Sequence, residues 1–490
     1  MVCRTILAID EGTTNSKAVL VSGSGEVLAS GACSVDIRHP KPGWVEQDAD
    51  RIWSSTVSAV AACLESAPAS EVSAVGISNQ RESVLAWSRA TGKPLGPVIT
   101  WQCRRTAPAC DALRNAGHEN VVISKTGLPL DPLFPASKAR WLLDNHCQGV
   151  AGDDICIGTV DSWLVWKFTG GAIHATDASN AARTQLYNIR TGEWDAELCD
   201  LFDIDPARLP VVLDSSCTFG ETRDADGLPD GIPIASAIGD SHGALFGHGA
   251  FGPGDGKVTF GTGSSIMTTI REFVVPPSGI TTTIAWQLKG TPTYAFEGNI
   301  LVSASILPWT AELLGLGSVD ALMELARSVD DTLGVNLVPA HVGLGSPHWN
   351  AEARGLIDGL TFGTRPAHVA HAAAQSMALQ VCDVFDIIKA NSPSEIGAIS
   401  VDGGPSRNAF IMQKVADYLD HPVATRESAE ASAIGAAYLA GLEAGFWPSL
   451  ESIAELDRRG ETLEPNLDET CRRSVRESWR KAIARSTHAT

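Results

Sequence analysis

Residues 6–17 combine the chemical groups that bind the phosphates of a nucleotide. The apolar run Ile-Leu-Ala-Ile ends on Asp10, a Glu-Gly-Thr-Thr turn follows, and a second apolar run begins after Lys17. A tight turn between two strands brings backbone N–H groups, the hydroxyls of Thr13 and Thr14 and the ammonium of Lys17 into a volume that suits phosphate oxygens. Asp10 is placed to hold a magnesium ion through water. A hairpin whose aspartate caps the turn is the alternative interpretation.

A second carboxylate, Asp240, follows the apolar run 235–239 and precedes a segment of small residues. This pattern predicts a strand that ends at Gly239 and a helix that begins beside Asp240. A carboxylate at the mouth of a cleft can take a proton from a hydroxyl group, which makes Asp240 a candidate general base. An aspartate that only caps the helix would give the same pattern.

Two further glycine-containing turns extend the nucleotide hypothesis. Residues 261–263 read Gly-Thr-Gly, so the backbone can come close to phosphates. Residues 401–408 predict a strand that passes through Gly403 and Gly404 into a helix, where a base and ribose can lie against bare backbone. A hairpin turn and a plain strand–helix connection are the respective alternatives. The sequence contains no Walker-type loop, zinc-protease motif or esterase elbow.

The elements that must position these residues follow an α/β pattern. Short apolar runs separated by turn signals predict strands at 6–10, 17–21 and 27–30. Apolar residues at helical spacing predict a helix over 48–65, and a buried-type strand is predicted at 72–78. Three antiparallel strands, a helix and a further strand indicate a mixed sheet.

A similar order recurs later in the chain. Residues 256–265 again read as strand, Gly-Thr turn and strand, and residues 396–401 resemble the strand at 72–78. We therefore expect two copies of one α/β unit. They would meet at the glycine-rich segment 240–255, which is a candidate hinge.

The composition excludes several classes of function. A net charge of -20 on 490 residues disfavours binding to nucleic acid or to anionic membranes. No apolar stretch is long enough to span a membrane, and we expect no leader, because no apolar h-region with a cleavage site comes before the first strand. The eleven cysteines are scattered without a C-x-x-C pair, which is typical of reduced thiols in a cytoplasmic protein.

Taken together, the motifs resemble the FGGY carbohydrate kinases and, within them, the glycerol kinases, over about residues 4–447. Besides the segments above, the resemblance depends on residues 41–46, 76–82, 101–105, 159–166, 176–180, 343–349 and 353–355. It implies an α/β fold of two actin-like ATPase (ribonuclease H-like) domains, each with a mixed five-stranded sheet, and a cleft between them.

The resemblance also implies which part of the chain binds each substrate. Residues 1–248 would bind a small polyol or sugar, residues 249–447 would bind ATP, and residues 448–490 would form a helical tail. No nucleic-acid or membrane partner is implied, and a homo-oligomer is compatible with the resemblance.

Site residues are implied one position at a time. The ATP contacts would be Thr13, Thr14, Asn15, Lys17, Gly261, Thr262, Gly263, Gly404 and Asn408. The acceptor would lie against Arg81, Glu82, Trp101, Leu133, Asp240, Ser241 and Ser265. Asp240 would be the general base, and Asp10 with Asp240 would hold Mg²⁺, through water. Taken singly, Arg81 and Glu82 could instead form an ion pair with each other, and Trp101 could be a core residue.

Three positions depart from the glycerol kinases, which carry Tyr, Gln and Phe at the places of Leu133, Ser241 and Ser265. The replacements enlarge the expected pocket. The sequence therefore predicts an ATP-dependent kinase that phosphorylates a primary hydroxyl of glycerol or a related polyol or sugar. A four- or five-carbon polyol or ketulose of the erythritol or xylulose type is the alternative acceptor. An actin-like ATPase that acts by conformational change is the competing class.

Overall fold

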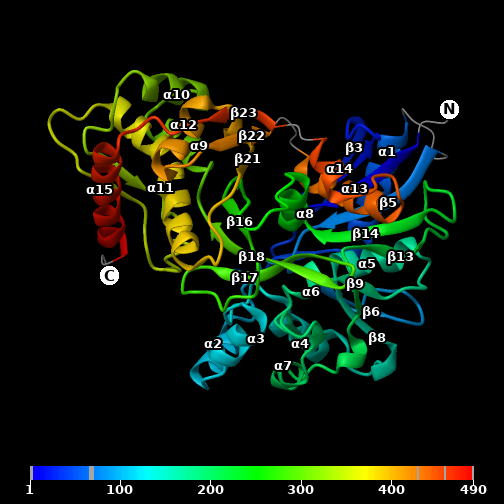
Figure 1. Cartoon of the computed structure of the whole chain (residues 1–490). Helices are drawn as coiled ribbons and strands as arrows, with labels where there is room; N and C mark the ends of the chain where they lie inside the picture. The colour runs from blue at the N-terminus through cyan, green and yellow to red at the C-terminus, as the bar shows by residue number, and fades with distance from the viewer. Residues whose placement is uncertain (1–3, 66–70, 427–429, 457–458, 488–490) are drawn as a thin grey trace.

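The structure is a computed structural model that describes residues 4–65, 71–426, 430–456 and 459–487. Two large mixed β-sheets dominate it, and helices cover both (Figure 1). The covering helices are α1 (Ala49–Leu64), α5 (Val160–Phe168), α8 (Asp240–Gly247), α9 (Ile306–Leu313), α10 (Val319–Arg327), α11 (Pro366–Asn391), α12 (Ala409–Leu419) and α13 (Ala431–Glu443).

The first large sheet has six strands in the order β13-β14-β5-β1-β2-β3. These are β1 (Thr5–Glu11), β2 (Asn15–Val21), β3 (Val27–Ser34), β5 (Val72–Asn79), β13 (Ser216–Glu221) and β14 (Pro233–Gly239). Strand β1 pairs antiparallel with β2 and parallel with β5, and β14 pairs parallel with β5. The strands expected at 6–10, 17–21 and 72–78 are confirmed, and the one expected at 27–30 continues to Ser34.

Alternating side chains on β1 serve two different cores. Leu7 and Ile9 belong to the core that contains α1 and α5, whereas Ile6 and Ala8 belong to the core that contains α8 and α13. The second of these cores also contains Met267 from the other large sheet. Helices α8 and α13 therefore lie between the two sheets and connect the two halves of the molecule (Figure 1).

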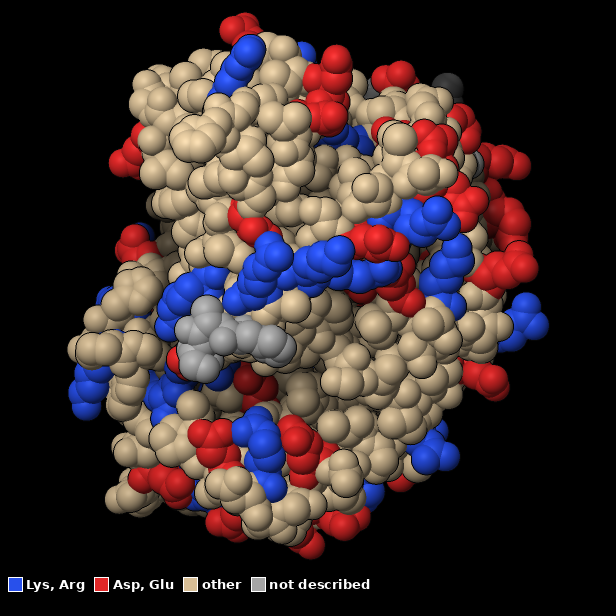
Figure 2. Space-filling model, turned by 90° about the vertical axis from the view of Figure 1, so that its left-hand side faces the viewer, with Lys and Arg blue, Asp and Glu red and all other residues tan. Residues whose placement is uncertain are grey.

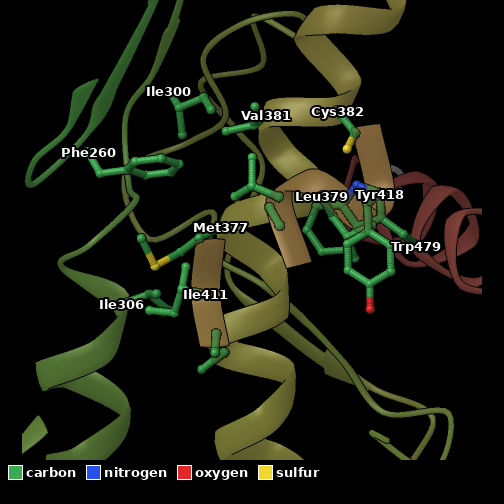
Figure 3. Close-up of a cluster of buried hydrophobic side chains, with 14 of the residues drawn as sticks. Phe260, Ile300, Ile306, Met377, Leu379, Val381, Cys382, Ile411, Tyr418 and Trp479 are labelled. Carbon is green, nitrogen blue, oxygen red and sulfur yellow. The ribbon is translucent and has the colours of Figure 1, made fainter. Parts of the chain in front are cut away.

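The second large sheet has seven strands in the order β17-β18-β16-β15-β21-β22-β23. These are β15 (Gly256–Phe260), β16 (Ser264–Ile270), β17 (Thr281–Leu288), β18 (Thr291–Ile300), β21 (Ile399–Gly403), β22 (Val423–Arg426) and β23 (Arg459–Leu463). Strand β15 pairs antiparallel with β16 and parallel with β21. Its core is built around α11, where Met377, Leu379 and Val381 lie among side chains from β15, β18 and α12 (Figure 3).

The two sheets share one topology. Strands β3-β2-β1-β5-β14 and β18-β16-β15-β21-β22 run in the same order with the same directions, so the expected repeat is confirmed. The expected width of five strands is too small, because β13, β17 and β23 add antiparallel neighbours at the sheet edges. An added strand satisfies the free backbone groups that an edge would otherwise expose.

The C-terminal segment also differs from the expected helical tail of 448–490. It contains α14 (Leu450–Ala454) and α15 (Glu469–Thr487), but β23 lies between them and extends the second sheet. Trp479 of α15 is buried in the core around α11, and its Nε1 donates to Asp383 Oδ2 at 2.7 Å. Residues 459–487 of the tail are thus part of the second half of the molecule, whereas Ile453 of α14 is buried in the core that contains α8 and α13.

The remaining elements lie mostly in the first half. A four-stranded sheet consists of β4 (Glu46–Gln47), β7 (Val98–Ile99), β6 (Val84–Ser88) and β8 (Ile155–Thr159). Two-stranded sheets pair β9 (Ala175–Asp177) with β12 (Val211–Leu213), β10 (Tyr187–Asn188) with β11 (Glu193–Trp194), and β19 (Asn336–Val338) with β20 (Leu356–Asp358). The other helices are α2 (Ala107–Asn115), α3 (Glu119–Thr126), α4 (Pro135–His146), α6 (Ala178–Ala181) and α7 (Ala196–Leu201).

Charge is unevenly distributed over this acidic chain. On the face turned toward the viewer in Figure 2, Lys and Arg side chains form a band across the middle of the molecule. Arg472 of α15 pairs with Asp420 at 2.6 Å, and Arg476 pairs with Asp386. Within the described ranges, no helix is long and apolar enough to cross a membrane.

Candidate active site

Asp240 begins helix α8 directly after strand β14. Its Oδ1 accepts a hydrogen bond from Arg81 Nε at 3.1 Å, and its side chain is 39% exposed. The residue in the capping position is Gly239, so the interpretation of Asp240 as a mere helix cap is wrong. A partly exposed carboxylate fixed by a buried arginine can receive a proton from a bound hydroxyl group.

The end of β14 is fixed from two sides. A Cβ at Gly239 would lie 2.6 Å from Arg81 Cγ, so only glycine lets Arg81 pass close enough to reach Asp240. The N–H of Gly239 donates to Ser179 Oγ at 3.0 Å, and Ser179 in turn donates its N–H to Asp177 Oδ2. The motif at 176–180 therefore positions the candidate base.

Arg81 belongs to a buried network of alternating charges. Its Nη1 lies 2.7 Å from Glu297 Oε1, and Arg183 Nη1 lies 2.7 Å from Glu297 Oε2. Arg183 Nε donates to Glu82 Oε1 at 2.6 Å. Arg81 and Glu82 thus have different partners instead of pairing with each other. Since Glu297 lies on β18 of the second sheet, one buried carboxylate joins both halves of the site.

The network keeps Arg81 and Glu297 charged. Burial by itself lowers the pKa of Arg81, but the carboxylates of Glu297, Glu82 and Asp240 outweigh it and raise that pKa. Burial raises the pKa of Glu297, but Arg183 and Arg81 outweigh it and hold the pKa well below its usual range. Removing one member would leave an uncompensated buried charge, which typically costs about 3–5 kcal/mol.

The first phosphate turn, between β1 and β2, touches the expected acceptor side. Trp101 Nε1 donates to Thr13 Oγ1 at 3.0 Å, and Gln47 Nε2 donates to the Thr13 carbonyl at 2.8 Å. Thr14 and Asn15 are exposed at the tip of the turn. Trp101 is 36% exposed and is therefore not a core residue.

Asp10 and Lys17 are cross-strand neighbours below this turn. Ser78 Oγ donates to Asp10 Oδ1 at 2.8 Å, and Lys17 Nζ lies 3.2 Å from Glu430 Oε1. Burial raises the pKa of Asp10 to about 6; the hydrogen bond from Ser78 opposes the shift, and the carboxylate of Asp240 adds to it. Asp10 and Asp240 are thus close enough for their charges to interact.

Two carboxylates that repel each other suit a divalent cation, whose charge would relieve the repulsion. Within the described part of the chain, no group of three or more His, Cys, Asp or Glu residues could hold a metal ion. A magnesium ion near Asp10 and Asp240 would therefore need phosphate oxygens and water to complete its ligands. Among the histidines, His248 lies with its Nε2 3.0 Å from Asp402 Oδ2, so its nearest carboxylate is taken up in this pair and not in a metal site.

Two of the positions that depart from the glycerol kinases meet in the structure. Ser265 on β16 donates from Oγ to Ser241 Oγ on α8 at 3.3 Å. Buried Lys257 donates from Nζ to Ser265 Oγ at 3.3 Å, and burial lowers the pKa of Lys257 to about 8. The N–H of Ser241 donates to Asp240 Oδ1 at 2.5 Å. A chain of polar groups therefore leads from Lys257 to the candidate base.

The second phosphate turn is residues 261–263, between β15 and β16, so this segment is a hairpin turn; Gly261 and Thr262 are exposed, and Gly263 packs against the carbonyl of Ile300. Gly404, at the start of a short 3-10 helix, is exposed, and a Cβ built there would meet nothing within 4 Å. Protein packing does not account for a glycine at that position, whereas the approach of a ligand would. Asn408 Oδ1 caps α12 and also accepts from Arg327 Nη2 at 2.9 Å.

Leu133 lies in the turn before α4. Four further functional candidates were not predicted from the sequence: Lys138, Arg183, Lys257 and Glu297. All four are buried charged residues. A single Glu in the otherwise uncharged run 294–300 was the one local signal for Glu297, because an isolated charge in a buried strand needs a partner.

Comparison with protein families matches both halves of the chain. Residues 5–247 match the N-terminal domain of the FGGY family of carbohydrate kinases, and residues 256–444 match its C-terminal domain. The chain belongs to the FGGY family of carbohydrate kinases. Membership sets aside the competing interpretation as an actin-like ATPase that acts only by conformational change, and it makes ATP a substrate of this enzyme.

Individual relatives cover nearly the whole chain. The chain is 46% identical to an apulose kinase of Pectobacterium atrosepticum over 98% of each protein, and 43% identical to a glycerol kinase of Deinococcus radiodurans over 98% of this chain and 97% of that one. Among solved structures, the glycerol kinase of Plasmodium falciparum with ADP aligns with a TM-score of 0.94 at 29% identity, over 99% of this chain and 98% of that one. A xylulose kinase of Lactobacillus acidophilus shares the fold, with a TM-score of 0.91 at 21% identity over 99% of both chains.

Proposed function

We propose that this FGGY kinase transfers the γ-phosphoryl group of ATP to a primary hydroxyl of a ketulose larger than glycerol, with apulose as the first candidate. The observation that carries the proposal is the pair of hydroxyls of Ser241 and Ser265 beside Asp240. Glycerol is the second candidate, since several relatives are glycerol kinases.

The chemistry follows from the fixed carboxylate. The acceptor hydroxyl donates its proton to Asp240 as the oxygen attacks the γ-phosphorus and the bond to the leaving ADP oxygen breaks. Arg81 Nε, at 3.1 Å, keeps the carboxylate in one orientation. Mg²⁺, held through water by Asp10 and Asp240, would neutralise phosphate charge when bound. The protein contributes mainly alignment and charge.

The nucleotide is proposed to lie between the two phosphate turns. Thr13, Thr14, Asn15 and Lys17 would face its phosphates from one side, and Gly261, Thr262 and Gly263 from the other. Gly404 leaves open space for the adenosine, with Asn408 beside it. Closure about residues 240–255 would exclude water, which otherwise competes as acceptor.

The size of the acceptor is argued from side chains. Where glycerol kinases carry Gln and Phe, Ser241 and Ser265 leave space and offer hydroxyls to a further oxygen of the substrate. Leu133 stands where glycerol kinases carry Tyr, so it offers no phenol group to the acceptor. A ketulose has both the extra carbons and the extra oxygens that this wall can accommodate, and a buried hydroxyl needs a polar partner.

A panel of apulose, xylulose, erythritol and glycerol, assayed by ADP release, tests the proposal. We expect the specificity constant for a ketulose to exceed that for glycerol by at least tenfold, or about 1.4 kcal/mol. The combined variant Leu133→Tyr, Ser241→Gln and Ser265→Phe should reverse the order while the KM for ATP stays unchanged. A wild-type preference for glycerol by a large margin would reject the ketulose, and no stimulation by any acceptor would reject the kinase activity.

A further inference from the structure

Lys138 places one ammonium group at the centre of the acceptor side. Its Nζ donates to the carbonyl of Glu82 at 2.7 Å, to that of Leu133 at 2.7 Å and to that of Thr100 at 3.3 Å. Each acceptor belongs to a different segment: the β5–β6 connection, the turn before α4 and the turn after β7. Three donors on one nitrogen match three carbonyls.

All three segments carry a proposed acceptor contact. Glu82 and Leu133 supply their own carbonyls, and Thr100 directly precedes Trp101. The relative positions of these three side chains therefore depend on a single nitrogen atom. Lys138 itself is 0% exposed, so it holds the segments from behind and does not reach the acceptor.

The backbone at Glu82 needs such support. Its φ is 60°, in the left-handed region, which is uncommon for a residue with a Cβ and is costly without surrounding contacts. The side chain of Glu82 is held by Arg183 at 2.6 Å, and its carbonyl is held by Lys138. Both ends of the residue are thus fixed in the strained conformation.

Burying the charged form of Lys138 costs free energy that packing contacts alone do not offset. Desolvation lowers the pKa of Lys138 to about 7, although the charge of Glu82 opposes the shift. An apolar side chain of similar length would fill the same space without that cost. The cation is therefore explained better by what it holds than by the stability of the fold.

We propose that Lys138 is a positioning residue for the sugar acceptor, because its ammonium sets the spacing of the three segments that carry Glu82, Trp101 and Leu133. The inference rests on the proposed function. It predicts an effect on acceptor binding that is separate from nucleotide binding, since the three carbonyls all lie on the acceptor side.

The test compares Lys138→Met with wild type, using the acceptor that performs best in the panel. We expect the KM for the acceptor to rise at least tenfold, while the KM for ATP and the slow hydrolysis of ATP without acceptor change less than twofold. Lys125→Met is the control, because it makes the same substitution at a lysine outside the proposed acceptor and nucleotide contacts. Lys125 makes ion pairs with Asp195 and Glu197. This control should leave both KM values unchanged.

Lys138→Gln, which is shorter and keeps an amide donor, serves if the methionine variant does not fold. An acceptor KM equal to that of wild type in a folded variant overturns the role of Lys138 alone. Equal losses of acceptor and ATP binding would also overturn it, because they indicate general disruption. A wild-type enzyme that no acceptor stimulates removes the proposed function and this inference together.

Discussion

The two phosphate turns occupy equivalent places in two copies of one sheet, yet they are built differently. In the β1–β2 turn, a side-chain contact adds to the backbone contacts: Trp101 Nε1 donates to Thr13 Oγ1, while the carbonyl of Thr14 accepts from Val35 N at 2.8 Å. In the β15–β16 turn the contacts are made through the backbone: the carbonyl of Thr262 accepts from Ser303 N at 2.8 Å and from Ser305 Oγ at 2.9 Å.

The difference indicates how the duplicated unit has specialised. The first copy carries Asp10, Arg81 and Asp240, which suit the transfer of a proton and the neutralisation of phosphate charge, and Glu297 of the second copy completes the charged network. The second copy offers exposed backbone at Gly261, Thr262 and Gly404, which suits close contact with a nucleotide. Changes at Asp240 should therefore affect chemistry, and changes at Gly404 should affect nucleotide affinity.

The largest effect is expected from Asp240→Asn. The amide cannot accept the proton of the acceptor hydroxyl, so kcat should fall by about a thousandfold. The affinity for ADP, measured by calorimetry, should stay within about twofold of wild type, because Asp240 is not among the proposed nucleotide contacts. Turnover near the wild-type rate would reject Asp240 as the base.

Glu297→Gln comes next, since it removes a buried carboxylate of the second sheet that pairs with Arg81 and Arg183. Two buried arginines would then face each other, which should cost about 3–5 kcal/mol of stability. A shift of Arg81 by about an ångström would lower kcat/KM for the acceptor by about a hundredfold. Thermal melting and steady-state kinetics measure the two effects, and an unchanged melting temperature with full activity would contradict the network.

The pH profile gives a smaller effect. The pKa of Asp10 is raised to about 6 by burial, so below that pH the carboxyl group gains a proton and loses the charge that attracts Mg²⁺. We expect kcat/KM for MgATP to fall about tenfold for each unit below pH 6. Excess Mg²⁺ should move this limb to lower pH, and a profile that is flat from pH 7 to 5 would exclude Asp10 from metal binding.

The smallest effect is expected from Gly404→Val. The structure leaves open space for the new side chain, so stability should not change, but the KM for ATP should rise about fivefold because the valine would occupy the proposed place of the nucleotide. Gly317→Val is the matched control, since a Cβ there also meets nothing within 4 Å. Equal KM values for the two variants would remove Gly404 from the nucleotide site.

Local sequence patterns predicted those helices and strands that interactions between near neighbours in the chain determine. The strand at 72–78 and the helix at 48–65 were found because apolar spacing reports burial directly, and Asp48 caps that helix by accepting from the N–H groups of Asp50 and Arg51. The position of Asp240 at the end of a strand was also predictable, because Gly239 and Asp240 end an apolar run.

The buried charges were not predictable in this way. Glu297 and Arg81 are far apart in the sequence, and only the pairing of two sheets around α8 and α13 brings them together. Lys138 appears in the sequence as an ordinary helical lysine, because its three partners are carbonyls that no residue type identifies. The additional edge strands β13, β17 and β23 depend on sheet pairing that local patterns do not specify.

A crystal structure with a ketulose and a non-hydrolysable ATP analogue tests the central claim most directly. The account predicts a primary hydroxyl within about 3.2 Å of an Asp240 carboxylate oxygen, aimed at the γ-phosphorus, with another substrate oxygen facing Ser241 and Ser265. A sugar whose hydroxyl groups all point away from Asp240, in a complex with the nucleotide in place, would contradict it.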